Sequence, residues 1–118
     1  MKIKIDGLDR LFSRYIRLRA GGRCEYCGAV KPLQCSHFHG RRKRNVRWNE
    51  NNAAALCFTC HLYLGENPLA HCEWFKKRLG DEKFEMLNIQ AQTIVKPDIN
   101  AITLYLKAKV KELEEKRC

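Results

Sequence analysis

The sequence predicts a small α+β protein, mostly helical, in which helices flank a short central segment that is braced by cysteines. Three observations predict this class. Apolar residues recur at helical spacing near both ends of the chain, two Cys-x-x-Cys pairs bracket the middle, and short extended segments lie between those pairs. The chain has 118 residues, of which 45% are hydrophobic, so we expect one domain with a core of modest size.

The first predicted helix runs from Leu8 to Ala20, and Gly21 and Gly22 end it. Its apolar face is formed by residues at helical spacing: Leu8, Leu11, Phe12, Tyr15 and Ile16. Three arginines occupy a different face: Arg10, Arg14 and Arg17. These arginines form either a solvated face or a surface that contacts phosphate groups.

Short elements and turns alternate in the central segment. We expect a strand over Leu33–Phe38 and a returning segment over Val46–Trp48. The loop between them carries four consecutive positive charges, at Arg41, Arg42, Lys43 and Arg44. A helix is expected to begin at Cys57, because four residues share one helical face: Cys57, Cys60, His61 and Leu64.

Two helices are expected between Asn67 and Thr93. Asn67 is expected to cap the first of them, Pro68 suits its first position, and Gly80 ends it. Asp81 is expected to cap the second.

A last helix is expected over residues 98–116, after a break at Val95-Lys96-Pro97, with Asp98 as its cap. Its apolar stripe is expected to pack on the domain or on a second copy of the chain, and consists of Ile99, Ile102, Leu106, Val110 and Leu113.

The charge of the chain indicates a polyanionic partner. Its net charge is +10, and nucleic acid is the leading partner for a small domain of that charge. The longest fully apolar run, Ala53–Phe58, is six residues, which is too short to cross a membrane. No apolar signal segment is visible at the N-terminus, so we expect a cytoplasmic protein that does not bind membranes.

The two Cys-x-x-Cys pairs predict a structural zinc site. Each tight turn brings two sulfurs to one point, and two such turns complete a closed tetrahedral site formed by Cys24, Cys27, Cys57 and Cys60. The remaining cysteines lack a partner motif. We expect Cys35 and Cys72 to pack as apolar residues and Cys118 to be a free thiol.

The middle of the chain also contains groups suited to phosphodiester hydrolysis. His37 could activate a water molecule, His61 could hold a divalent cation, and Asn52 could orient the base. A positive surface that holds the DNA backbone would be supplied by Arg41, Arg42, Lys43, Arg44 and Arg47.

These residues resemble a known family. C-E-Y-C-G, S-H-F and N-N-A-A-A-L-C-F-T-C-H are similar to the HNH (ββα-metal) endonucleases, in which two CxxC knuckles brace a hairpin and a helix. More of the chain, from L-D-R-L-F-S-R-Y-I-R-L-R through H-F-x-x-R, V-R-W-N-E-N-N and L-G-E-N, is similar to the NinG/Rap-type phage recombination nucleases. The wider resemblance covers about residues 8–90.

The resemblance implies a zinc-braced ββα-metal core and a mechanism of DNA cleavage. His37 would be the general base, Asn52 would hold the hairpin and orient His37, and His61 would bind a catalytic Mg²⁺ or Mn²⁺. The products would carry 5′-phosphate and 3′-hydroxyl ends. It further implies a nuclease domain over residues 1–97, with its core at 23–64, and a bacterial or phage-infected cell as the setting. The apolar stripe of the last helix makes residues 98–118 a C-terminal helix outside that domain.

The chain departs from the family at one position. HNH enzymes commonly carry Asp or His immediately before the base as a second metal ligand, and this chain has Ser36 there. A catalytic cation would then depend on His61, DNA phosphate and water, or on another group such as His39 or Glu50. Ser36 favours the alternative function, a non-catalytic zinc module that binds DNA or RNA.

Overall fold

The computed structural model describes residues 2–116, with side chains described from Asp6 onward. Cys118, expected to be a free thiol, lies outside the described residues. The elements follow in the order α1 (Lys2–Arg19), β1 (Leu33–His37), a 3-10 turn (Glu50–Asn52), β2 (Ala53–Cys57), α2 (Phe58–Glu66), α3 (Pro68–Leu79), α4 (Asp81–Gln92) and α5 (Ile99–Lys116). The expected mostly helical α+β class is confirmed.

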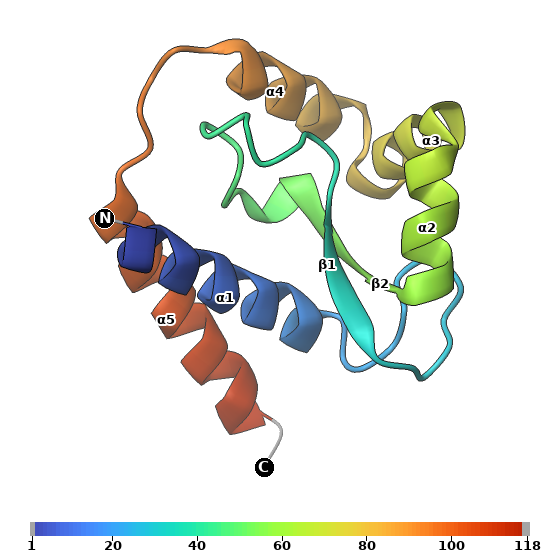
Figure 1. The fold of residues 1–118 in the computed structure, drawn as a ribbon, viewed down its shortest axis with the longest axis horizontal. Coiled ribbons are helices and arrows are strands. Elements are labelled where there is room, and N and C mark those ends of the chain that lie inside the picture. The colour runs from blue at the N-terminus through green and yellow to red at the C-terminus, as the bar shows by residue number, and fades with distance from the viewer. Residues whose placement is uncertain (1, 117–118) are drawn as a thin grey trace.

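A two-stranded antiparallel sheet lies between two groups of helices (Figure 1). Leu33 pairs with Cys57 and His37 with Ala53. The returning strand is therefore Ala53–Cys57, and the expected return over Val46–Trp48 is wrong. Those residues lie in consecutive turns, in which Val46 N donates to Lys43 O and Val46 O accepts from Asn49 N.

All five residues of β2 are buried, because helices cover both of its faces. Ala53 and Ala55 belong to a cluster with α1 and α5, which includes Phe12 and Leu106. The alternate residues Ala54 and Leu56 belong to a second cluster with α2, α3 and α4. The strand therefore joins two small cores into one domain. Its uniformly apolar sequence follows from burial on both faces.

Helix α1 starts six residues before the predicted Leu8 and ends as expected at Gly21 and Gly22, whose φ angles are 67° and 83°. At these left-handed angles a side chain would be strained, so glycine suits the helix end. The arginine face is exposed, while the apolar face enters the first core cluster.

Two expected caps differ from the structure. Asn67 occupies the position before α3, but its side chain donates to Tyr63 O at 2.7 Å and does not cap the helix. Gly80, with φ of 88°, precedes α4, and Asp81 is the first residue of that helix. An acidic residue in the first turn still stabilises the helix through its dipole.

The cap expected for the last helix is present, since Asp98 Oδ1 accepts from Ala101 N at 3.0 Å. Helix α5 packs on α1 of the same chain. Its buried stripe includes Leu106 and Val110, and Leu113 packs against the same cluster. The first of the two predicted packing arrangements is therefore the one seen within the chain (Figure 1).

We predict that Ala54→Leu destabilises the protein by about 1–3 kcal/mol, because there is no space between β2 and its covering helices for three more carbons. Chemical denaturation measures the change. Ala108→Leu, on the exposed surface of α5, is the matched control and should change stability by less than about 0.5 kcal/mol. Equal effects of the two substitutions would contradict the tight packing of β2.

Candidate functional site

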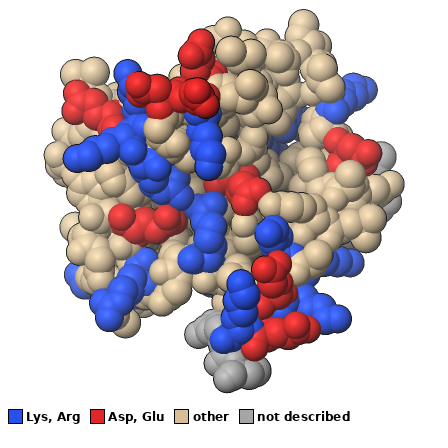
Figure 2. Space-filling model, turned by 180° about the vertical axis from the view of Figure 1, so that it is seen from behind, with Lys and Arg blue, Asp and Glu red and all other residues tan. Residues whose placement is uncertain are grey.

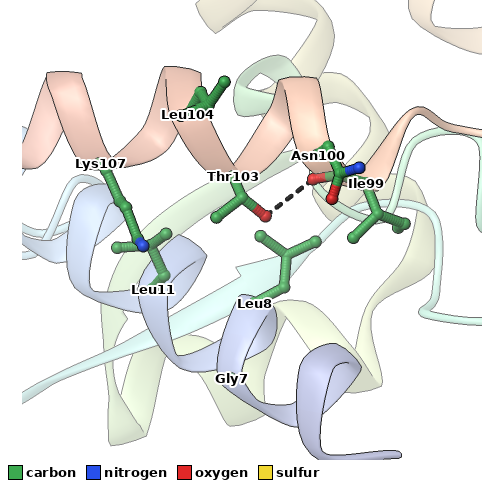
Figure 3. Close-up of a pocket in the computed structure, with 8 residues that line it drawn as sticks. All are labelled: Gly7, Leu8, Leu11, Ile99, Asn100, Thr103, Leu104 and Lys107. Carbon is green, nitrogen blue, oxygen red and sulfur yellow. Dashed lines mark hydrogen bonds between the residues drawn. The ribbon is translucent and has the colours of Figure 1, made fainter. Parts of the chain in front are cut away.

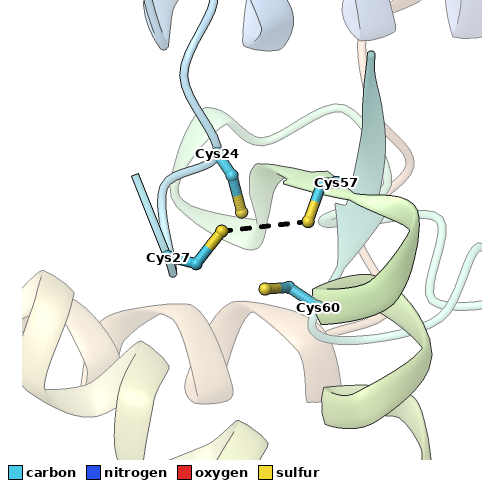
Figure 4. A group of neighbouring side chains, drawn as sticks. All are labelled: Cys24, Cys27, Cys57 and Cys60. Atoms are coloured by element: carbon cyan, nitrogen blue, oxygen red, sulfur yellow. Dashed lines mark hydrogen bonds between the residues drawn. The ribbon is translucent and has the colours of Figure 1, made fainter. Parts of the chain in front are cut away.

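Four cysteine sulfurs converge beside the end of β2 (Figure 4). Cys24 and Cys27 come from the turn after α1, and Cys57 and Cys60 come from the junction of β2 and α2. The four Sγ atoms lie within 4.8 Å of one another, and Cys27 Sγ is 3.9 Å from Cys57 Sγ. Zn–S bonds of about 2.3 Å place sulfurs about 3.8 Å apart in a tetrahedron. The cluster is therefore positioned to hold a metal ion and fits structural zinc.

The protein backbone prepares one of these sulfurs for a cation. Burial raises the pKa of the Cys24 thiol, but backbone N–H groups of Cys27, Cys57 and Tyr26 outweigh this and lower the pKa to about 6. Burial and the neighbouring sulfurs, Cys57 first, raise the pKa of Cys60. Once Cys24 is a thiolate, its negative charge opposes the loss of protons from the three neighbouring thiols. A bound cation would offset this repulsion and allow all four sulfurs to ionise.

Glu25, inside the first cysteine turn, attaches the cluster to the sheet. Its Oε2 accepts from Ala55 N at 2.6 Å, and its Oε1 accepts from Arg78 Nη2 on α3 at 2.9 Å. Arg19 Nη2 lies 3.6 Å from Glu25 Oε2 and donates to Ala53 O at 2.9 Å. The turn is thus fixed to α1, β2 and α3 together.

His37 is half-buried at the end of β1, on the side of α1. Its ring lies 5.6 Å from that of Phe12, and its Nε2 donates to Arg47 O at 2.9 Å. A carbonyl oxygen only accepts, so Nε2 carries the proton and Nδ1 carries the lone pair. Burial lowers the pKa of His37 below 6.5, although the bond to Arg47 O acts in the opposite direction. His37 is therefore neutral at neutral pH.

Arg47, which holds His37 through its carbonyl, is itself held by its side chain. Arg47 Nε and Nη2 donate to Asp9 at 3.0 and 2.5 Å, and Trp48 Nε1 donates to Asp9 Oδ1 at 2.9 Å. The guanidinium of Arg47 lies in this half-buried ion pair with Asp9 of α1, while Arg41–Arg44 are exposed. Binding of nucleic acid by Arg47 together with the loop stays a prediction.

Asn52 is fully buried and ties the basic loop to the sheet. Its Nδ2 donates to His39 O and Val46 O, both at 3.0 Å, and its Oδ1 accepts from His39 N at 2.8 Å. The side chain touches both ends of the loop, and no described contact joins it to His37. His39 is bonded through Nε2 to Asn88 Oδ1 of α4 at 2.7 Å.

His61 lies on the other side of β1 from His37. Gln34 Oε1 accepts from His61 Nδ1 at 2.6 Å, so Nε2 carries the lone pair. Gln34 and Ser36 share one strand face and His37 belongs to the opposite one. The described contacts therefore bring His37 and Arg47 together, and likewise His39 and Asn52, but leave His61 with Gln34.

The sequence comparisons give a family. The family pattern of NinG, described as Bacteriophage Lambda NinG protein, matches residues 2–116. The chain belongs to the NinG family. No curated protein and no solved structure matches it closely enough to be reported. Within the described residues, no helix of this NinG-family protein is long and apolar enough to cross a membrane.

The other groups considered as metal ligands are engaged elsewhere in this NinG-family protein. Glu50 accepts from the hydroxyls of Tyr15 and Tyr105, both at 2.6 Å. Burial raises the pKa of Glu50, but the bonds from Tyr105 and Tyr15 hold it below its usual value. Burial also raises the pKa of Cys35 to about 12, as expected for a packed thiol.

A cavity of about 590 Å³ between α1 and α5 contains none of the predicted site residues (Figure 3). Its walls are mainly apolar, with Leu8 and Leu11 from α1 and Ile99 and Leu104 from α5. The cysteine and histidine sites of the NinG-family chain are thus separate from this cavity.

Sequence reasoning missed four residues that position the site. Asp9 and Gln34 hold Arg47 and His61, while Glu25 and Asn88 hold the cysteine turn and His39. Their partners lie far along the sequence, so spacing carried no signal for three of them. Glu25 is the one with a sequence signal, because it lies inside a cysteine turn.

We predict that the protein binds one zinc ion per chain and that Cys57→Ser loses it in competition with a chelator, because one thiolate is removed from a closed four-sulfur site. Native mass spectrometry gives the stoichiometry and thermal unfolding gives the stability. Cys72→Ser, outside the cluster, should bind zinc like the unmodified protein. Retention of zinc by Cys57→Ser would argue against the four-cysteine site.

Proposed function

We propose that this NinG-family protein is a metal-dependent HNH-type DNA endonuclease that acts in phage recombination, with duplex or branched DNA as its substrate. His37 is the general base, and the four cysteines hold a structural zinc. The observation that carries the proposal is the hydrogen bond and the neutral protonation state of the His37 ring. Its Nε2 proton is fixed on Arg47 O, which leaves Nδ1 as a proton acceptor on a neutral ring.

The surroundings of His37 suit an attack by water on phosphorus. Arg41 and Arg47 both bring positive charge near the ring, and burial keeps the ring neutral despite the nearby Asp9 carboxylate. A neutral imidazole can take a proton from water, while the cations offset the charge that develops on the phosphate. The exposed Arg41–Arg44 loop supplies further charge for the DNA backbone.

A divalent cation would supply stabilisation of the leaving oxygen when bound. His61 suits such a cation, because its Nδ1 proton is held by Gln34 Oε1 and Nε2 keeps its lone pair. Glu66 lines the same hollow as His61 and Gln34 and offers a carboxylate. His39 and Glu50 are bonded elsewhere, and Asn52 acts as a positioning residue for the loop that carries Arg47.

One observation favours the alternative function, a non-catalytic zinc module that binds DNA or RNA. Ser36 is buried, and it occupies the position at which the HNH family commonly carries Asp or His as a metal ligand. His61 also lies on the opposite side of β1 from His37. Such a module would need the zinc site and the basic loop, and neither histidine.

We predict that His37→Gln lowers cleavage of supercoiled plasmid and of a branched DNA by about 10²–10⁴-fold with Mg²⁺ or Mn²⁺. Glutamine keeps an N–H for Arg47 O but cannot accept a proton from water. His71→Gln, on α3, is the matched control, and EDTA gives the metal-free rate. His61→Ala tests the cation separately. Tight DNA binding without cleavage by the unmodified protein would establish the non-catalytic module.

We also predict the direction of the pH dependence. Because the pKa of His37 is lowered below 6.5, its neutral form persists through pH 7 and is lost only as the pH falls further. The cleavage rate should therefore be close to level around pH 7 and above, and decline as the pH becomes acidic. A decline that begins above pH 7 in a single-turnover profile would exclude His37 as the base.

A further inference from the structure

The exposed face of α1 borders a continuous basic hollow. Two adjoining hollows, of about 490 and 360 Å³, share Arg14 and Arg17 in their walls. Arg10 and Arg41 line the larger one and Lys31 lines the smaller one, and all five side chains are exposed. We call this surface the α1 groove. It joins the arginine face of α1 to the first residue of the basic loop.

Little negative charge opposes the α1 groove. Asp9 lines the larger hollow, but its carboxylate already accepts from Arg47 and Trp48. Glu114 of α5 pairs with Arg14. Seen from behind, the molecule carries basic and acidic side chains interspersed (Figure 2). The groove therefore combines a concave shape with an excess of positive charge.

The spacing of the arginines matches a nucleic acid strand. At 1.5 Å per residue, Arg10 and Arg17 are about 10.5 Å apart along α1. Phosphates follow one another every 3.4 Å along the axis of a duplex strand, so this length covers about three of them. Asp9, in the wall of the larger hollow, pairs with Arg47, whose carbonyl oxygen accepts from His37 Nε2, and these contacts place the groove beside the proposed base.

We propose that the α1 groove binds the phosphodiester backbone of duplex DNA and leads one strand toward His37. This proposal rests on the proposed action on DNA, but it does not depend on cleavage. It assigns phosphate contacts to Arg10, Arg14 and Arg17, in addition to the loop residue Arg41. The carboxylate of Glu114 competes with DNA for Arg14.

The first test compares two double variants that remove the same charge. Arg10→Gln with Arg17→Gln lies in the groove, and Lys77→Gln with Lys83→Gln lies on exposed positions of α3 and α4. Binding of a fluorescein-labelled duplex is followed by anisotropy in EDTA, between about 50 and 200 mM salt. Zinc content and thermal unfolding establish that each variant is folded.

The groove variant should bind more weakly, with a slope of log K against log salt that is shallower by about 1.8, because two phosphate contacts are lost. The control should keep the slope of the unmodified protein. Equal losses in both double variants would overturn the proposal, since net charge alone would then explain binding. If only the groove variant loses affinity and the unmodified protein cleaves no DNA, the groove proposal stands and the proposed nuclease activity is rejected.

A second test should strengthen binding of duplex DNA, whereas the first should weaken it. Glu114→Gln removes the carboxylate that pairs with Arg14 and should tighten duplex binding by about two- to fivefold at low salt. Glu85→Gln, exposed on α4, removes the same charge outside the groove and should change affinity less. An unchanged affinity in Glu114→Gln, or an equal gain in both, would contradict binding of DNA at Arg14.

Discussion

The burial of β2 on both faces is the constraint on which the rest of the structure depends. The strand consists of small and apolar residues, so α1 can approach one face and the cysteine cluster and α2 can approach the other. Its two ends carry different chemistry. Ala53 pairs with His37 at one end, and Cys57 provides a sulfur at the other. The five residues of β2 therefore fix the position of the cysteine cluster relative to His37.

Part of the positive charge in the composition is engaged within the fold. Arg19 and Arg78 both approach Glu25 and donate to backbone carbonyls, and Arg47 is paired with Asp9. Each of these guanidinium groups links two or more helices, strands or turns, because the planar arginine side chain can donate several hydrogen bonds at once. Exposed basic residues gather on the loop and on α1, where Arg10, Arg14, Arg17 and Arg41–Arg44 lie, so net charge alone does not locate the interacting surface.

Local signals predicted the parts of the fold that short-range chemistry decides. Glycines ended α1 and α3, Asp98 capped α5, and the two cysteine turns met as expected. Strand β2 was missed, because burial on both faces removes the alternation that marks a half-buried strand. The partners Asp9 and Gln34 were also missed. Their contacts span 38 and 27 positions along the chain and arise only from folding.

The pairing of α1 with α5 has a consequence for the order in which the chain can fold during synthesis. The apolar face of α1 is completed by residues more than eighty positions later, including Leu106 and Val110. At about 5–20 residues per second, that face waits several seconds for its cover on the ribosome. The cysteine cluster closes over a much shorter stretch of chain, so zinc uptake can precede the docking of α5.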